Sequence, residues 1–335
     1  MRPEQAVDPG ASLSAVFVSE ISSLTAPMLA AWVEKGHRIA TVVVPGPRSG
    51  KRSSFSTWRR RRRRGAILRR YLSHRHPALI EFGPPYDWAE LGRQLAALEA
   101  DLLICFGFRG LIPQAVLTLF PKGGLNLHPA LLPHYRGPHP IHRLVIDDNH
   151  EIHGGVTLHK MTPAFDQGDI LAQVALSIED WHSAATVSAA TASAMARLVA
   201  DAAPEHCRGK LTGTPQPSGE YVWAQLERSP LIVGGDSSSA HVARLCRIVG
   251  PSVAVNVLVD GKPVRLAQPI LRPRPVTGKA SVHRWGLVAF DCADGRVVHL
   301  AYNRLTRLLM QLQRKLGSIG PRRPALPIRK FGSED

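Results

Sequence analysis

Short apolar runs and longer helical patterns alternate along the N-terminal part of the chain. The runs predict buried strands at residues 15–19, 38–44, 102–106, 124–127 and 155–159. Helices are predicted between or after them, at residues 24–35, 87–99, a short segment opened by Pro113, and 183–199. Each longer helix has capping residues, namely Ser22 or Ser23, Asp87 with Glu90, and Ser183, and Gly36 ends the first one. This alternation predicts an α/β domain with a mostly parallel sheet and helices on both faces.

The pattern changes after residue 205. Glycines and prolines between Arg208 and Gly219 predict a linker. A short helix at 240–248 then precedes apolar runs at residues 254–259, 264–267, 287–291 and 297–301, with Asp-Gly turns at Asp260 and Asp294. These hairpin signals predict a small β-barrel. The expected organisation is therefore an α/β domain at 12–205, a linker at 206–228, a β-rich domain at 229–305, and a basic helix and tail at 306–335.

The tail helix, expected over residues 302–317, has an amphipathic pattern. Leucines recur at helical spacing and basic residues occupy the remaining positions. Packing of the leucine face against the barrel is favoured over contact with a membrane or RNA.

Positive charge is unevenly distributed. The formal net charge is +16, and residues 45–80 contain twelve lysines and arginines and no acidic residue. Six of these form the run Arg59, Arg60, Arg61, Arg62, Arg63 and Arg64. Such a density attracts polyanions such as RNA, nucleotides or anionic lipid head groups. The alternative is a solvated loop that serves only solubility, and charge alone does not decide between them.

Composition argues against several other classes. No apolar run approaches the roughly 20 residues that span a bilayer, and residues 1–14 carry charges without the apolar core of a signal peptide. The widely spaced cysteines (Cys105, Cys207, Cys246 and Cys292) suit free thiols in a reducing compartment, so a cytoplasmic protein is expected. Neither GxGxxG nor GxxxxGK[ST] occurs, so a dinucleotide or P-loop nucleotide is not expected.

Asn126, His128 and Asp166 are the candidates for catalysis. An amide can hold a developing oxyanion, an imidazole can move or stabilise charge, and a carboxylate can orient both and balance protons. Asn126 and His128 follow the predicted strand at 124–127, and Asp166 lies in the loop after the strand at 155–159. Ligands of such sheets bind outside the carboxyl ends of the strands, so we expect the three residues at one edge of the sheet. Seven histidines fall between residues 128 and 159, but no zinc-binding motif accompanies them, and no metal is expected.

The segments NLHPALLPHYRG (126–137), GVTLH (155–159) and FDQGDILAQ (165–173) resemble the 10-formyltetrahydrofolate-dependent formyltransferase family. The resemblance covers roughly residues 15–195 and implies a Rossmann-like catalytic domain. In the tRNA-directed members an OB-like barrel follows, which residues 240–302 loosely resemble.

The resemblance implies a role for each candidate residue. Asn126 would donate to the formyl oxygen, His128 would stabilise the oxyanion or shuttle the amine proton, and Asp166 would set the protonation of His128 and help deprotonate the amine. The implied folate site comprises Phe106, Gly107, Phe108, Arg109, Leu111, Pro163, Phe165 and Asp169. The implied acceptor site comprises Arg136, Gly137, His139 and His142. The co-substrate would be 10-formyltetrahydrofolate, with no metal.

The identity of the acceptor is left between alternatives. The tRNA-directed members usually carry a pair of small residues after Arg-Gly, where this sequence has Gly137-Pro138-His139-Pro140. They also carry a Gly-Thr turn after the first strand, where it has Ser19-Glu20. Both departures favour a small-molecule amine as acceptor, such as a sugar nucleotide or a biosynthetic intermediate. The run from Arg59 to Arg64 favours methionyl-tRNA formyltransferase activity on initiator tRNA, because those members place a basic loop after the second strand. A third hypothesis is a non-catalytic RNA- or nucleotide-binding protein that keeps the fold.

Overall fold

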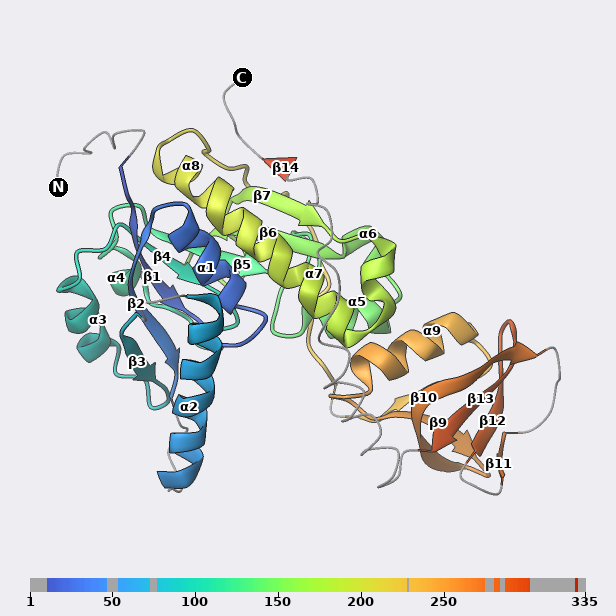
Figure 1. Cartoon of the computed structure of the whole chain (residues 1–335). Helices are drawn as coiled ribbons and strands as arrows, with labels where there is room; N and C mark the ends of the chain where they lie inside the picture. The colour runs from blue at the N-terminus through green and yellow to red at the C-terminus, as the bar shows by residue number, and fades with distance from the viewer. Residues whose placement is uncertain are drawn as a thin grey trace.

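The computed structural model describes residues 11–46, 54–72, 77–227, 229–274, 280–283, 287–301 and 329–330. Its larger sheet contains five parallel strands: β1 (Ser14–Val18), β2 (Arg38–Pro45), β3 (Leu79–Phe82), β4 (Leu102–Cys105) and β5 (Gly124–His128). Three antiparallel strands extend it: β6 (Gly155–Lys160), β7 (Ile170–Ala175) and β14 (Arg329–Lys330). The order is β14-β7-β6-β5-β4-β1-β2-β3 (Figure 1). The mostly parallel sheet is thus confirmed.

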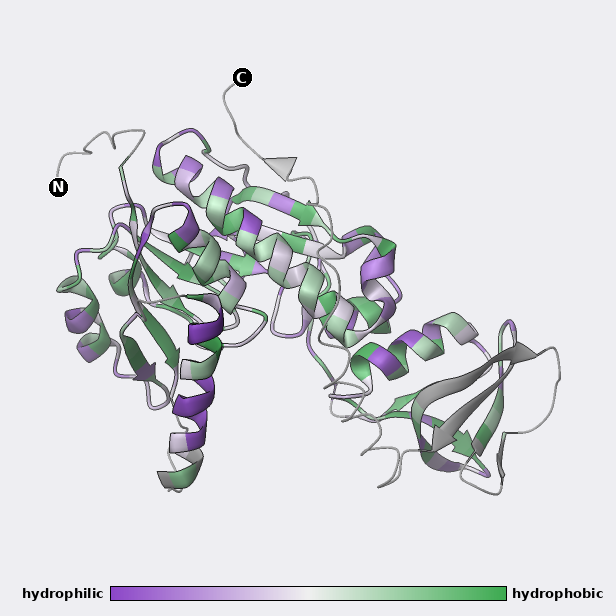
Figure 2. Ribbon diagram, in the orientation of Figure 1, coloured by the Kyte–Doolittle hydropathy of each residue, from purple (hydrophilic) through white to green (hydrophobic). Residues whose placement is uncertain are grey.

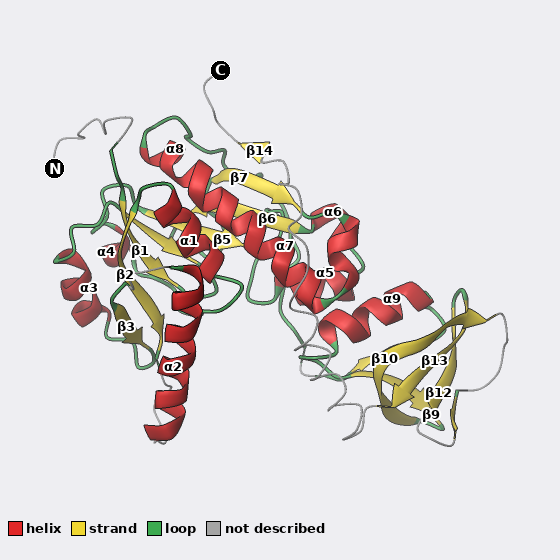
Figure 3. Ribbon diagram, in the orientation of Figure 1, coloured by secondary structure: helices red, strands yellow, loops and turns green. Residues whose placement is uncertain are grey.

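Helices cover both faces of this sheet, as predicted (Figure 3). One face carries α1 (Ala26–Glu34), α2 (Ser54–Tyr71), α7 (Ala184–Arg197), a π-helical turn at Leu198–Ala202, and α8 (Ala203–Cys207). The other carries α3 (Trp88–Ala96) and α4 (Gln114–Leu117). Alternate residues of β1 enter the two cores, with Phe17 packing beside Trp32 and Val16 in the opposite cluster. Burial on both sides explains why these strands are continuously apolar.

Local capping signals act largely as the sequence predicts. Asp87 accepts a hydrogen bond from the Glu90 N–H at 2.9 Å, and Ser183 caps α7. Gly36, at φ +84°, follows the end of α1 in the left-handed conformation that glycine adopts without strain. The first helix begins later than predicted, at Ala26, because Ser22 accepts from the Leu24 N–H in a preceding turn.

The arginine-rich segment is a helix, so the expectation of a basic loop is wrong. Arginine is a good helix former, and Leu68 and Leu72 anchor the C-terminal part of α2 in the core. Arg64 is 2% exposed and pairs with Glu20 at 2.8 Å and Glu81 at 3.1 Å. It is therefore a structural residue, not a free contact for a polyanion. Figure 2 shows the hydrophilic band of α2 where this helix extends beyond the sheet.

The second sheet contains β8 (Leu231–Ile232), β9 (Val255–Val259), β10 (Lys262–Arg274), β11 (Ser281–His283), β12 (Leu287–Cys292) and β13 (Gly295–Ala301). Its order is β11-β12-β13-β10-β9-β8, and both Asp-Gly turns join antiparallel strands as predicted. The helix α9 (Ser239–Arg244) and a π-helical turn at Leu245–Val249 pack between this sheet and α5 (Pro140–Ile146). Within the described strands β8 and β11 do not pair, so closure into a barrel stays a prediction. The predicted helix at 302–317 lies outside the described residues.

Two further predictions concern the cysteines, expected as free thiols, and membrane-spanning helices, which were not expected. All four cysteines are buried and free. Of the helices that the structure describes, none combines the length and the hydropathy needed to cross a membrane.

Candidate active site

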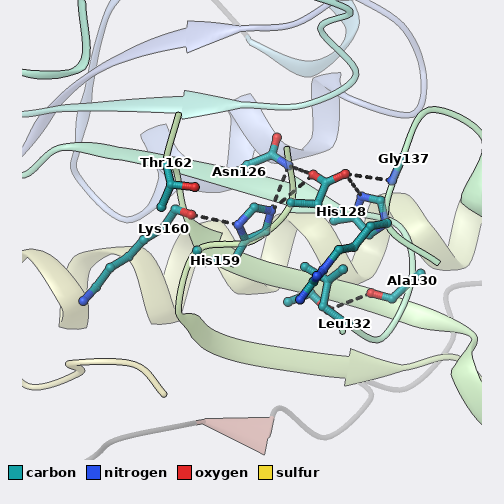
Figure 4. A network of polar contacts seen from close by, with 12 residues as sticks. Asn126, His128, Ala130, Leu132, Gly137, His159, Lys160 and Thr162 are labelled. Carbon is teal, nitrogen blue, oxygen red and sulfur yellow. Dashed lines mark hydrogen bonds and ion pairs between the residues drawn. The ribbon is translucent and has the colours of Figure 1, made fainter. Parts of the chain in front are cut away.

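Polar side chains line one face of β5 and β6. In β5, Leu125 and Leu127 enter the core, so Asn126 and His128 point to the opposite face. The antiparallel register of β6 places His159 opposite Asn126 and Thr157 opposite His128. Residues directly opposite in an antiparallel pair share a face, so the two strands present a patch of four polar side chains next to one another. Figure 4 shows three of them, Asn126, His128 and His159.

Asp166 reaches this patch from the end of β6 opposite to the one that the sequence predicts. The loop after β6 was expected at the carboxyl edge of parallel strands, but β6 runs antiparallel to β5, and Lys160 pairs with Leu125. The loop therefore leaves from the opposite end and folds back over the polar face. Its aspartate accepts from Asn126 Nδ2 at 3.3 Å through Oδ1, and from the Gly137 N–H at 2.9 Å through Oδ2. The structure thus brings Asn126, His128 and Asp166 together, although not for the expected reason.

Backbone carbonyls determine which ring nitrogen of His128 and of His159 acts as the donor. His128 Nε2 lies 2.7 Å from the Tyr135 carbonyl and must donate to it, which leaves Nδ1 as the nitrogen facing Asp166 Oδ2 at 3.5 Å. His159 Nδ1 donates to the Lys160 carbonyl at 2.8 Å, so its Nε2 accepts from Asn126 Nδ2 at 3.0 Å. The amide group of Asn126 therefore points its two hydrogens at His159 and Asp166.

The environment favours a neutral imidazole beside an ionised carboxylate. Burial lowers the pKa of His128, and the opposing effect of Asp166 does not restore it. Burial alone would raise the pKa of Asp166, but His128, His159 and the Gly137 N–H together bring it well below its usual range. At neutral pH two proton acceptors, Nδ1 of His128 and Oδ2 of Asp166, thus lie 3.5 Å apart. This pair is suited to receive a proton from an incoming ammonium group.

The loop that follows β5 is held over the patch by its own hydrogen bonds. Thr157 Oγ1 donates to the Ala130 carbonyl at 2.7 Å and accepts from the Leu132 N–H at 3.0 Å. Gln173 adds a bond to the Leu132 carbonyl at 2.8 Å. The loop then turns sharply at Tyr135 and Gly137, at φ +59° and +113°, which directs the Gly137 N–H at Asp166.

The residues predicted to bind folate lie in two loops that border the network. Cys105 pairs with Asn126 in the sheet, so the loop carrying Phe106, Gly107, Phe108, Arg109 and Leu111 starts beside the amide. Pro163 and Phe165 lie just before Asp166 and are exposed, as are Arg109 and Leu111. Phe108 packs on Tyr86 and Trp88. Asp169 instead forms an ion pair with Lys160 at 3.0 Å.

The residues predicted to bind the acceptor fall into two groups. Arg136 is already engaged, because its guanidinium donates to Gln216 at 3.1 and 2.5 Å and lies over the Tyr221 ring at 5.0 Å. His139 and His142 are half-buried at the start of α5. Burial lowers the pKa of both, and the charge of Arg109 adds to this for His139.

Sequence reasoning missed His159 and Gln216. The alternation in GVTLHK, with Val156 and Leu158 apolar and Thr157 and His159 polar, was a usable signal for His159. That His159 lies beside Asn126, however, can be known only from the pairing register of β5 and β6. Gln216 lies in the predicted linker, and nothing in its local sequence points to a site. Among the described residues, no group of three or more histidine, cysteine, aspartate or glutamate side chains is placed to hold a metal ion.

Comparisons with known proteins identify the family to which this sequence is similar. The family model described as formyl transferase matches residues 14–202. The chain is 30% identical to the methionyl-tRNA formyltransferase of Heliobacterium modesticaldum over 73% of this chain and 75% of that protein. It is 32% identical to the enzyme of the same name from Paraburkholderia phymatum, over 52% of this chain and only about half, 53%, of that relative.

Solved structures share the fold at low identity. One is the N-formyltransferase of Helicobacter canadensis in complex with folinic acid and dTDP-3-aminofucose, with a TM-score of 0.58 and 12% identity over 86% of this chain and 99% of that one. Another is HypX from Aquifex aeolicus in complex with tetrahydrofolic acid, with a TM-score of 0.54 and 18% identity over 86% of this chain and 44% of that one.

Proposed function

This chain belongs to the formyl transferase family, and we propose that it transfers a formyl group from 10-formyltetrahydrofolate to a primary amine. The observation that carries the proposal is the convergence of Asn126, His128 and Asp166 on one polar face, between the two loops that border it. Formyl transfer needs a donor for the developing oxyanion and an acceptor for the amine proton, and this arrangement contains both.

Asn126 supplies the oxyanion donor in this proposal. Its amide hydrogens point at His159 Nε2, at 3.0 Å, and at Asp166 Oδ1, at 3.3 Å. A formyl oxygen must take over one of them, and the longer contact to Asp166 is the weaker. As the carbonyl becomes tetrahedral its oxygen gains charge, so the exchange is more favourable in the transition state than with bound substrate. That difference is what accelerates the reaction.

His128 and Asp166 handle the proton. An amine that arrives as ammonium must lose a proton before its nitrogen can attack the formyl carbon. The attack releases a second proton, which N10 of the folate takes up as its bond to the formyl carbon breaks and tetrahydrofolate leaves. The Nδ1 lone pair of His128 and the Asp166 carboxylate face each other, and a proton delivered to either is stabilised by the other. The Nε2–H remains bonded to the Tyr135 carbonyl throughout, which keeps the ring oriented.

For the acceptor, we propose a small molecule, such as a sugar nucleotide or a biosynthetic intermediate that carries a primary amine. A hollow of about 490 Å³ beside the site is lined by Arg143 and Trp223, among others. A Cβ atom on Gly137 would lie 3.0 Å from the Trp223 ring, and the Gly137 N–H bonds to Asp166, so one residue of the hollow packs on the loop that holds the carboxylate. The exposed indole of Trp223 suits stacking against a ring, whereas the guanidinium of Arg143 is paired with Asp147 at 2.9 Å.

A second acceptor, initiator tRNA, is favoured by a separate observation on α2. Phe55 and Trp58 are 63% and 51% exposed and stack at 5.8 Å. The guanidinium of Arg59 lies over Phe55 at 5.9 Å, and that of Arg62 lies over Trp58 at 5.2 Å. Exposed aromatic rings among free arginines are typical of surfaces that bind single-stranded nucleic acid.

The first experiment follows tetrahydrofolate release when the protein is incubated with 10-formyltetrahydrofolate and a panel of amines, including amino-sugar nucleotides and methionyl-tRNA. Release that depends on one amine is expected. Lack of turnover with every acceptor, together with no folate binding, would overturn the proposal. Salt-sensitive RNA binding that survives Asn126→Ala, without folate turnover, would instead support a non-catalytic binding protein.

A second experiment separates the acceptors. Arg59, Arg62 and Arg63 are exposed and can be changed to glutamine without touching Arg64, which anchors the helix. If tRNA is the acceptor, its KM should rise and depend less on salt, whereas a small amine should be unaffected. Arg69→Gln, an exposed position on the same helix, is the matched control.

A further inference from the structure

The segment that connects the two domains runs along the rim of the active site. At one end, Thr214 and Ile170 exchange two backbone hydrogen bonds, each of 2.9 Å, just after the Asp166 loop. At the other, the Ala224 N–H donates to the Arg136 carbonyl and the His139 N–H donates to the Ala224 carbonyl. The predicted linker is therefore fastened to both loops that form the site.

Gln216 lies between these attachments and connects the two loops directly. Its Nε2 donates to the Asp166 carbonyl at 2.9 Å and to the Gly168 carbonyl at 2.7 Å. Its Oε1 accepts from Nε and Nη2 of Arg136 at 3.1 and 2.5 Å. The Gln216 amide thus uses both of its N–H donors and its oxygen in four hydrogen bonds. The two from the Arg136 guanidinium are charge-assisted.

The Asp166 loop needs such support. It starts at the far end of β6 and must fold back to reach Asn126 and His128. Asp166 has φ +54°, a left-handed conformation that costs a non-glycine residue free energy unless its surroundings hold it. The preceding residues Pro163 and Phe165 are exposed and contribute little packing. The two bonds from Gln216 restrain the backbone on both sides of this strained position.

We propose that Gln216 is a positioning residue that holds the Asp166 carboxylate in register with His128 and Asn126 by bridging the Asp166 loop to Arg136. This inference rests on the proposed formyl transfer. It also gives Arg136 a role different from direct contact with substrate, since its guanidinium is directed at Gln216 and Tyr221. The hydrogen bonds of Gln216 go to the Arg136 guanidinium and to two backbone carbonyls.

Two substitutions at this position separate the two halves of the bridge. Gln216→Ala removes all four bonds. Gln216→Glu keeps an acceptor for Arg136 but loses both donors and places a carboxylate oxygen against the Asp166 and Gly168 carbonyls. If Gln216 acts by positioning Asp166, both variants should lose about 10²-fold in kcat, the effect of a displacement of about 1 Å. Ser218→Ala, at an exposed position two residues along, is the control and should behave as wild type.

Two readouts distinguish positioning from a general loss of stability. The acid limb of the kcat profile should move to lower pH in Gln216→Ala, because a displaced Asp166 no longer supports the protonated form of His128. Hydrogen exchange at the Gly137 amide should accelerate by up to about tenfold, because this N–H donates to Asp166 Oδ2. A Gln216→Glu variant with normal kcat would show that only the Arg136 half matters and would overturn the proposal.

The exchange measurement needs no turnover, so the two proposals can fail separately. If wild type transfers no formyl group but Gly137 exchange accelerates in Gln216→Ala, the proposed function fails and the bridge remains. If wild type turns over and Gln216→Ala matches it in kcat, pH profile and Gly137 exchange, the positioning role is wrong even if the melting temperature falls.

Discussion

Asp166→Asn is the sharpest test of the network, because it keeps the shape of the side chain and removes its charge. The carboxylate is 11% exposed and accepts through both oxygens, from Asn126 on one side and from the Gly137 N–H on the other. An amide has only one oxygen. Whichever way it is oriented, its NH2 group faces a donor that the carboxylate satisfied.

This mismatch should lower both the stability and the activity of the variant. One buried donor is left without a partner, which should lower the free energy of unfolding by about 1–3 kcal/mol. The loss of the proton acceptor should lower kcat by about 10²–10⁴-fold, the usual contribution of a positioned acid or base. The negative charge of Asp166 raises the pKa of His128, which burial lowers. Removing the charge should therefore lower that pKa further below 6.5, and His128 should remain neutral to lower pH.

Three measurements check this reasoning: single-turnover formyl transfer, urea unfolding, and titration of His128 by NMR. Asp201→Asn is the control, because it also neutralises an aspartate in an ion pair, the surface pair with Lys35 at 2.9 Å. It should cost at most about 1 kcal/mol and leave turnover unchanged. A His128 pKa that rises in Asp166→Asn would refute the electrostatic argument, and kcat within a few-fold of wild type would remove Asp166 from the chemistry.

Other predictions follow from the same contacts. Asn126→Ala should lose about 10²–10³-fold in kcat in steady-state assays while the circular dichroism spectrum is retained; near-normal kcat would exclude it as the oxyanion donor. Arg64→Met should lower the free energy of unfolding by about 1–3 kcal/mol in urea, since the hydrogen bonds of a buried cation to the partly exposed Glu20 and Glu81 are lost, and a change below about 0.5 kcal/mol would contradict a structural role. Gly168→Ala places a Cβ atom 1.8 Å from the Lys160 carbonyl, so the loop should shift and both melting temperature and kcat should fall; wild-type values of both would show that the loop adapts.

Much of the fold was readable because its signals are local. Period and capping predicted β1, β2, β4, β5 and β6 and the helices α1, α3, α4 and α7, since each pattern needs only neighbouring residues. The short strand β3, the strand β7 and the helices α2 and α5 were not predicted. The errors arose where distant residues decide. Arginines at 59–64 suggested a solvated loop by charge alone, but Glu20 and Glu81, far away in sequence, bury Arg64 and hold the segment as a helix.

By itself the sequence determined the α/β architecture, the two Asp-Gly hairpins and the chemical types in the site, namely an amide, an imidazole and a carboxylate. Only the tertiary structure decided how they meet. The antiparallel direction of β6 brings His159 beside Asn126 and sends the Asp166 loop back across the sheet. Gln216, 50 residues along the chain from Asp166, supports that loop. The physical reason is that strand direction and loop closure depend on hydrogen bonds between segments far apart in sequence, which no local pattern encodes.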